Sequence, residues 1–586
     1  MPWQRFVIFT LAEPTSTTKS SDLPLIDASN PRCSGLARRW RTVPNHQEKG
    51  EVMKGLFRSV LWTGLALILS ACLSDFSPRQ KVVCLKQGQQ QVFAAASNDP
   101  RVRLDWYLDG EKVAENQGTF TYAAEGLAGD RPAIHTLAVL ALRGGVGGWP
   151  PQITGGMKWK VIVQRRAWRS EEMIDADSGS DHNPQVAMDA DGGAMAIWQR
   201  AENRIWASRY VKASWGAAEP ISPEWALPSP PFPPPPWLWL TDPKIAMDPT
   251  GKAIAIWLLA REDSESPVTI VWANRFDGAA WGTAKLFETE FTGDAFHPQI
   301  AMDAKGRAFA VWQQEAWDNP WGMYHEINIW AVRFDETDWG PIELLQNHFE
   351  VDEAAMNPQI AMGSADNALV VWKQFEGFYS GEYTWTFIAA NRFDGSSWGT
   401  AEAIETRDQP LWSWSPQLAM DAKGNALAVW LVGDNTGNRS IWQNRFVDGD
   451  WGQAELIADG PADSLELAMN GEGKAVIVWI QDDAVWASRF DGLSWGAAVK
   501  ISGDPSPASS PRIAMDTAGN AIAVWLKADG SDAGEVWASR LDGAAWEEAQ
   551  RIGTAPATSV QLAMSANGSA IAVWESEGVI WANRFE

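Results

Sequence analysis

The chain has 586 residues, which predicts about two to four domains, and its 45% hydrophobic and 21% charged residues exclude a disordered chain. The net charge of -25 disfavours a nucleic-acid partner, because phosphate binding needs clustered Lys and Arg, and three Cys are too few for a disulfide framework. The chain holds 37 Trp against 6 Tyr, an excess that needs a structural cause.

A basic segment (residues 53–58) precedes a ten-residue apolar core (residues 61–70) and the tetrapeptide LSAC, which ends at Cys72. The core is too short to span a bilayer as a helix, and its flanks are typical of a secretory signal. The tetrapeptide resembles the lipobox of bacterial lipoproteins. This resemblance implies that residues 53–71 are a signal peptide, removed when Cys72 is lipidated (palmitate or a similar acyl chain), so that the N-terminal lipid holds the protein on a membrane of the cell envelope.

Leu73 follows Cys72 where an Asp would favour the inner membrane, and by resemblance to Gram-negative lipoproteins this favours the outer membrane. The sequence leaves open whether the protein faces the periplasm or the exterior. Residues 1–52 show no periodic pattern, and we expect an unstructured extension that either precedes the true start at Met53 or is lost with the signal. Residues 72–80 are polar and are predicted to be a tether.

Residues 81–165 read as short strands separated by turns. Residues 102–108 alternate in polarity, Asp109-Gly110 is a hairpin signal, and apolar runs follow at 120–122, 135–142 and 157–163. This pattern resembles an immunoglobulin-like or PKD-like β-sandwich with Trp106 as the core aromatic residue.

From residue 166 to residue 586 the chain repeats. Each unit has an Ile-Ala-Met segment, a turn, a strand ending in Trp, a variable connection and a second Trp-containing strand. The period is 46 to 60 residues, which is typical of β-propeller blades. Eight copies are present, marked by the residues Met188, Met247, Met302, Met362, Met420, Met469, Met515 and Met564.

The eighth unit ends at Glu586 without a fourth strand, whereas residues 167–174 match the fourth-strand pattern and precede the first unit. The sequence therefore predicts an all-β chain in which an eight-bladed β-propeller is closed by this N-terminal strand. Residues 276–281 (FDGAAW) partly resemble the Asp-box of sialidase-like propellers, but Arg275 replaces the leading Ser and the spacing is one residue shorter. The resemblance implies a stabilised turn and no sialidase chemistry.

Two of the four connections in each unit keep a constant length, and the other two vary, so one face of the ring is uniform and the opposite face is built from variable loops. Extra aromatic residues gather in or beside the variable connections of the first four units. We interpret them as candidate ligand-binding residues, with capping of the loops' own small cores as the equal alternative. They are Trp225, Trp237, Trp239, Trp317, Trp321, Trp385, Trp412 and Trp414.

Repeated residues are poor catalytic candidates, because one site does not need eight copies. The sequence shows no Ser nucleophile elbow, Gly-rich phosphate loop, Cys pair or metal-ligand spacing among its six His. We therefore expect no catalytic residues, no metal and no cofactor. The predicted function is a monomeric, non-enzymatic binding scaffold for an envelope protein or glycan, similar in architecture to lipoprotein propellers that assist outer-membrane assembly. The alternative is a surface lectin or a sialidase-like glycoside hydrolase, since loop carboxylates such as Glu315 and Asp318 abound and nothing selects a pair.

Overall fold

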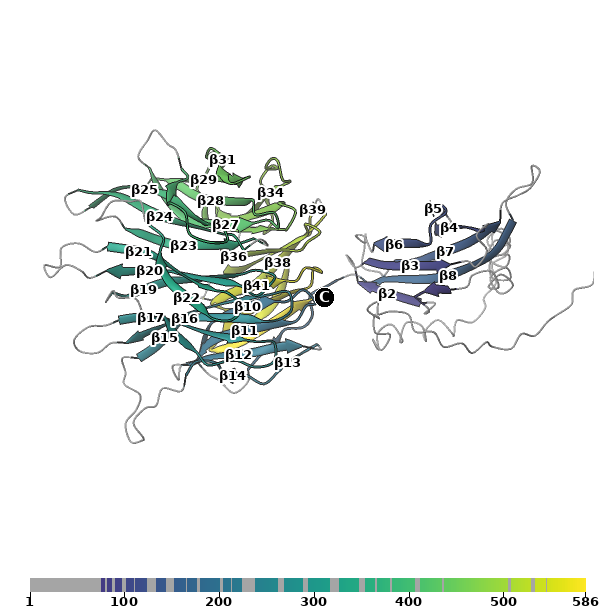
Figure 1. Ribbon diagram of the computed structural model, residues 1–586, viewed down its shortest axis with the longest axis horizontal. Coiled ribbons are helices and arrows are strands. Elements are labelled where there is room, and N and C mark those ends of the chain that lie inside the picture. Colours follow the sequence, from purple (N-terminus) through teal and green to yellow (C-terminus); the bar gives the residue numbers. More distant parts are fainter. Residues whose placement is uncertain are drawn as a thin grey trace, which may run out of the picture. The chain divides into compact units, whose positions relative to one another are not determined.

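The computed structural model describes residues 75–586 apart from residues 79–81, 87–89, 97–101, 110, 124–132, 144–151, 165, 176–179, 201–203, 212, 224–237, 262–267, 288–292, 317–325, 347–353, 364–365, 380–381, 406–410, 435–436, 504–506, 529–532 and 544. The described residues form strands β1 to β43 and no helix, so they hold no helix that spans a membrane (Figure 1). The all-β prediction is confirmed. The predicted extension (1–52), the signal peptide (53–71) and Cys72 lie outside the described residues.

The chain divides into two compact units, and Val163–Glu586 belongs to the larger one. The eight strands before residue 165 form two sheets. The first has the order β1 (Asp75–Ser77), β3 (Gln90–Ala96) and β6 (Thr119–Ala123). The second has the order β2 (Val82–Lys86), β8 (Gln152–Gln164), β7 (Ala133–Arg143), β4 (Val102–Leu108) and β5 (Glu111–Ala114).

Aromatic residues from both sheets meet in the smaller unit. Phe93 of β3 packs edge-on against Trp159 of β8 at 5.2 Å between ring centroids, and Trp159 stacks on Trp106 of β4 at 5.8 Å. The predicted core residue Trp106 is fully buried. The predicted tether needs a correction, because residues 75–77 form β1, which pairs with β3. Trp159 Nε1 also donates to the carbonyl oxygen of Pro78 at 2.8 Å.

From residue 166 onward, the described strands form eight antiparallel sheets, which we number 1 to 8 in chain order. Their first strands are β10 (Asp181–Met188), β15 (Leu238–Met247), β19 (Ala295–Met302), β23 (Ala355–Met362), β27 (Trp412–Met420), β32 (Asp463–Met469), β36 (Ala508–Met515) and β41 (Ser559–Met564). Their second strands are β11 (Ala194–Arg200), β16 (Ala253–Arg261), β20 (Ala308–Ala316), β24 (Ala368–Tyr379), β28 (Ala426–Gly433), β33 (Ala475–Gln481), β37 (Ala521–Ala528) and β42 (Ala570–Ser576).

The third strands are β12 (Arg204–Val211), β17 (Val268–Phe276), β21 (Glu326–Phe334), β25 (Glu382–Phe393), β29 (Arg439–Val447), β34 (Ala484–Phe490), β38 (Gly534–Asp542) and β43 (Val579–Phe585). The outer strands of sheets 1 to 7 are β13 (Ser214–Trp215) with β14 (Glu219–Pro220), β18 (Lys285–Phe287), β22 (Trp339–Leu344), β26 (Glu402–Ala403), β30 (Asp450–Trp451) with β31 (Glu455–Ala458), β35 (Val499–Lys500), and β39 (Ala545–Trp546) with β40 (Gln550–Ala557).

The outer strand of sheet 8 comes from the other end of the unit. Strand β9 (Glu172–Met173) pairs antiparallel with β43, and Trp168 forms an isolated bridge with Phe585. The backbone N–H of Ile174 donates to the carbonyl oxygen of Ile580 at 2.9 Å. Residues 172–173 therefore form the outer strand of sheet 8, beside β43, where the sequence predicted a fourth strand.

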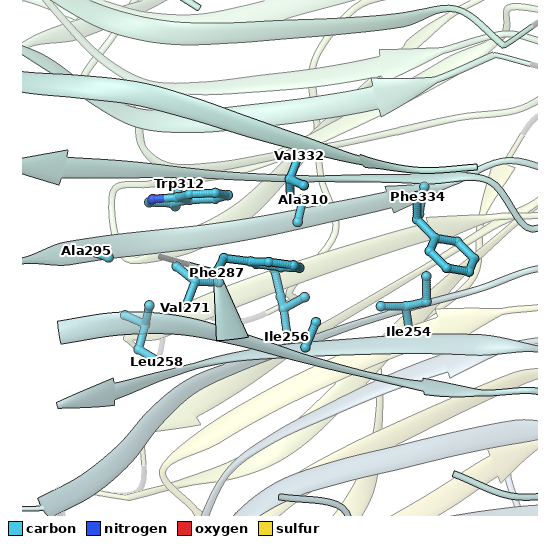
Figure 2. Packing of buried hydrophobic residues seen from close by; sticks show 12 residues of the cluster. Ile254, Ile256, Leu258, Val271, Phe287, Ala295, Ala310, Trp312, Val332 and Phe334 are labelled. Carbon is cyan, nitrogen blue, oxygen red and sulfur yellow. The ribbon is translucent and has the colours of Figure 1, made fainter. Parts of the chain in front are cut away.

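The second strands explain how the sheets stack, because their two faces differ. Successive side chains of a strand point to opposite faces. On β16 the large aliphatic residues Ile254 and Ile256 face sheet 3, where Ala310 and Trp312 of β20 receive them (Figure 2). The same exchange of aliphatic residues against Ala and Trp recurs between other successive sheets, and it also joins sheet 8 to sheet 1. Full burial accounts for the eight repeated Trp residues of these strands: Trp198, Trp257, Trp312, Trp372, Trp430, Trp479, Trp525 and Trp574.

The first strands lie along the inner edges of the sheets. Each contacts the first strand of the next sheet, from β10 through β15, β19, β23, β27, β32 and β36 to β41, and β41 contacts β10. Contacts between neighbouring first strands thus run through all eight sheets and return to the first.

Candidate functional site

The repeated Arg of the third strands belongs to the framework. Its guanidinium lies over an aromatic ring of the following sheet, as Arg209 does over Phe276 at 5.0 Å and Arg584 of sheet 8 does over Tyr210 of sheet 1 at 4.9 Å. Such cation–π contacts stabilise partly desolvated sites. Seven Arg residues make this contact: Arg209, Arg275, Arg333, Arg392, Arg445, Arg540 and Arg584.

The repeated turn Asp is also structural. Asp303 Oδ1 accepts hydrogen bonds from the backbone N–H groups of Lys305 (2.9 Å) and Arg307 (3.0 Å), and Asn470 does the same in sheet 6. These bonds stabilise the turn between the first two strands. Among the described residues, no group of three or more His, Cys, Asp or Glu side chains is arranged to hold a metal ion.

Four of the eight candidate Trp residues are described. Trp239 lies on β15 and Trp385 on β25, and both are exposed, whereas Trp412 and Trp414 lie half-buried on β27. All four therefore sit on strands that continue beyond the repeat pattern. In sheet 4 the pairing of β24 with β25 runs outward as far as Tyr379. Trp225, Trp237, Trp317 and Trp321 lie outside the described residues.

The structure brings Trp412 and Trp414 together around Lys373 of β24. The Lys373 ammonium lies 4.5 Å from the ring centroid of Phe375, 5.7 Å from Trp412 and 6.0 Å from Trp414. Lys373 is buried, and burial lowers its pKa to about 8. The guanidinium of Arg439 lies 4.8 Å from the ring centroid of Trp414. We call Lys373, Phe375, Trp412, Trp414 and Arg439 the aromatic–cation cluster.

Carboxylates beside this cluster are engaged by other groups. Asp463 Oδ1 pairs with Arg439 Nη1 of the cluster at 3.3 Å, and Glu405 is held by hydrogen bonds. Glu405 is buried, and its Oε2 accepts hydrogen bonds from the hydroxyl of Ser413 (2.7 Å) and the backbone N–H of Ile388 (3.1 Å). Its Oε1 accepts from Trp430 Nε1 at 3.1 Å. A carboxylate with these partners stabilises the junction of sheets 4 and 5 and is poorly suited to proton transfer.

A second set of side chains, which sequence reasoning missed, lies on the first strands. The residues two positions before each Met, and the Met itself, pack into the inter-sheet cores, as Ile300 and Met302 do. Alternation then places the residue three positions before the Met on the other face. We call these eight residues the inner ring: Gln185, Lys244, Gln299, Gln359, Gln417, Glu466, Arg512 and Gln561.

Neighbouring members of the inner ring touch. Arg512 Nη1 donates to Glu466 Oε1 at 2.9 Å, and Arg512 Nε donates to Gln561 Oε1 at 3.2 Å, so sheets 6, 7 and 8 are linked at one level. The Arg512 and Glu466 side chains are 31% and 28% exposed, so water reaches this ion pair.

The charges of the inner ring also act on one another. Burial lowers the pKa of Lys244 on sheet 2, and the positive charge of Arg512 on sheet 7 lowers it further. The negative charges of Asp242 and of Glu466 on sheet 6 raise it. Burial raises the pKa of Glu466, against the effects of Arg512 and Lys244. The charges of Lys244, Glu466 and Arg512 therefore act on one another although their strands belong to sheets 2, 6 and 7.

The strands bulge just before the inner ring. Seven first strands shift register there, and the residue two positions before the ring residue has a left-handed backbone. His297, with φ of 48°, is the one His among these otherwise Asn, Asp and Ser positions. Burial lowers its pKa, with Asp242 opposing and Lys244 adding to the shift. Bulges re-aim side chains, and such backbone outliers concentrate at functional positions.

One signal in the sequence marks the inner ring. A Gln stands three residues before the Met in five repeats, and Lys244, Glu466 and Arg512 replace it in the other three. In a repeat whose framework positions keep their residue type, three charged replacements at one inward position indicate a role outside the packing.

No protein-family model and no curated protein matches the chain. Solved structures similar to it are sialidases and a polysaccharide lyase. The NanB sialidase from Streptococcus pneumoniae is 9% identical over 69% of this chain and 93% of that chain, with a TM-score of 0.32. A polysaccharide lyase PL25, an ulvan lyase, is 11% identical over 64% and 96%, with a TM-score of 0.40. The intramolecular trans-sialidase from Ruminococcus gnavus is 10% identical over 59% and 94%, with a TM-score of 0.33. At such values we take no activity or ligand from them.

Proposed function

We propose that the eight sheets of the larger unit are the blades of one closed β-propeller, which serves as a non-enzymatic, lipid-anchored binding scaffold in the cell envelope. Closure is supported by the contacts of β41 with β10, by the pairing of β9 with β43 and by the shared core of sheets 8 and 1. The Arg584 guanidinium over the Tyr210 ring repeats, between sheets 8 and 1, the contact found at six of the seven other junctions of successive sheets. A ring closed in this way presents its ligand-binding residues on a rigid frame.

The anchoring part of the proposal rests on the sequence before residue 75. The basic segment, the short apolar core and the lipobox-like tetrapeptide support lipidation at Cys72 and an outer-membrane location. In a Gram-negative host, we expect the intact chain in the outer-membrane fraction and Cys72→Ser in the soluble fraction. Equal membrane recovery of both chains would argue against the lipid anchor.

The observation that carries the binding function is the aromatic–cation cluster. The repeat requires no Trp at positions 412 and 414, yet both rings and Phe375 surround Lys373 at the junction of sheets 4 and 5. Trp rings with a cationic side chain offer flat apolar surfaces and a positive charge, which suit a glycan or an aromatic protein segment. The non-enzymatic part is supported by the carboxylates at this junction: the oxygens of Glu405 are held by Ser413, Ile388 and Trp430, and Asp463 pairs with Arg439.

A binding screen with matched variants tests this function. The intact chain is applied to a glycan array and to detergent-solubilised envelope, in parallel with Trp414→Ala and with Leu493→Ala, which removes an apolar side chain that is 85% exposed at a turn after the third strand of sheet 6. We expect Trp414→Ala to lose the ligand and Leu493→Ala to keep it. Sugar binding identifies a glycan ligand, and a defined co-purifying protein identifies a protein partner. Loss of binding in both variants, or turnover abolished by one carboxylate substitution, would contradict the proposal.

A further inference from the structure

The inner ring carries an unbalanced positive charge inside an acidic protein. Arg512 and Glu466 form an ion pair and offset each other, which leaves the Lys244 ammonium. Asp242 precedes Lys244 by two residues, and its negative charge raises the pKa of Lys244. Asp242 is exposed to solvent. Among the residues that the structure describes, the Lys244 ammonium has no hydrogen bond or ion pair within bonding distance. The eight inner-ring residues thus carry a net charge of +1, with Asp242 beside them, in a chain whose net charge is -25.

An enclosed ammonium without a partner is unfavourable. Burial lowers the pKa of Lys244, which shows that its surroundings disfavour the charged form. An anion at the ring removes this penalty, because it provides the missing partner in a region of reduced dielectric constant.

Hydrogen-bond donors surround the same point. Arg512 uses Nε and Nη1 for Gln561, Glu466 and the carbonyl oxygen of Pro511, and Nη2 keeps both of its N–H groups. The side-chain amides of four Gln residues form no hydrogen bond within the described part of the chain and are open to water: Gln185, Gln299, Gln359 and Gln417. Each amide has two N–H donors, and an Arg fork matches the oxygen pair of a carboxylate or phosphate.

We propose that the inner ring is a binding site for a small oxyanion, a carboxylate or a phosphate group, held by the Lys244 ammonium and the Arg512 guanidinium with glutamine amides around it. Lys244 lies on sheet 2 and Arg512 on sheet 7, so the anion bridges the two sheets. Glu466 orients Arg512 through their ion pair. The partial exposure of Arg512 and Glu466 gives a ligand a path from solvent. The aromatic–cation cluster contributes no residue to this site, so the two sites are independent.

The repeat provides its own test variant. Lys244→Gln installs the residue that five other repeats carry at this position, so the substitution suits the local fold. Lys252→Gln is the matched control. It makes the same charge change in the same sheet, at the turn where the Lys252 backbone N–H donates to Asp248 Oδ1. The intact chain and both variants are titrated calorimetrically with acetate and, separately, with inorganic phosphate, in a buffer without other small oxyanions.

We expect saturable binding of one equivalent to the intact chain and to Lys252→Gln, and at least roughly tenfold weaker binding to Lys244→Gln, the effect of losing one charge-assisted hydrogen bond. Preference for acetate identifies a carboxylate ligand, and preference for phosphate identifies a phosphate ligand. Absence of saturable binding with both probes overturns the proposal, and so does equal binding to Lys244→Gln when its thermal midpoint matches that of the intact chain. Trp414→Ala should leave the anion titration unchanged, which separates this site from the proposed scaffold function.

Discussion

Ile174 reports on whether the N-terminal strand seals the larger unit. Its side chain is 8% exposed and packs with Trp198 of sheet 1 and with Ile571 and Ile580 of sheet 8. Met173, its neighbour, is 50% exposed. The burial of Ile174 exists only when β9, sheet 8 and sheet 1 lie together, so truncating it removes packing from the closing junction.

Replacing a buried Ile by Ala lowers the free energy of unfolding by about 2–4 kcal/mol, the sum of lost burial and the cavity left behind. We expect this loss for Ile174→Ala and a loss within about 0.5 kcal/mol for Met173→Ala, as for other exposed positions. Guanidinium denaturation of both variants, followed by Trp fluorescence and circular dichroism, measures the difference. Equal losses in the two variants would refute the burial of this strand between sheets 8 and 1.

Three further predictions test the framework and the aromatic–cation cluster. Arg584→Gln removes the cation over a ring of sheet 1 and the 3.0 Å contact with Glu172, and it should lower the unfolding free energy by about 1–3 kcal/mol. Arg489→Gln should lower it by less, because the sheet after Arg489 offers no aromatic ring at this position. The pKa of Lys373 is about 8 in the folded chain against 10.5 ordinarily, so the unfolded chain binds more protons between these pH values and the stability of the folded chain rises with pH through this range. Lys373→Met should therefore stabilise the chain by about 3 kcal/mol below pH 8. Denaturation curves at a series of pH values should show this gain fading towards pH 10.5. Asp303→Ala should lower the thermal midpoint because it removes the bonds from two backbone N–H groups and the pairing with Arg307, while Asp303→Asn should lower it less, because it keeps the two backbone bonds, as Asn470 does, and loses only the pairing of Oδ2 with Arg307.

Local pattern explains why much of the fold is predictable from the sequence. The Ala–aliphatic–Trp alternation of the second strands encodes two different buried faces, and the stacked cores of Ile254 and Ile256 on Trp312 follow from it. The missing outer strand of the last unit likewise predicts the pairing of residues 172–173 with β43. These features depend on neighbours in the repeat and need no knowledge of the loops.

The candidate sites depend on contacts that no local pattern carries. Trp412 and Trp414 read as loop residues because they lie outside the repeat, but β27 continues outward and brings them to Lys373 of the preceding sheet. The inner ring reads as a repeated Gln, and only the arrangement of sheets 2, 6 and 7 lets the charges of Lys244, Glu466 and Arg512 act on one another. The pairing of residues 75–77 with β3 was missed because the segment lacks an alternating pattern.

Hydrogen exchange along β43 tests the closed arrangement most directly. Amides of Val579–Phe585 are measured by mass spectrometry in the intact chain and in a chain from which residues 166–175 are deleted. A sealed eighth sheet predicts strong protection of these amides in the intact chain, and much faster exchange after the deletion while sheets 3 to 5 keep their protection. Equal exchange of β43 in the two chains would show that the N-terminal strand does not cover this edge and would contradict the closed ring.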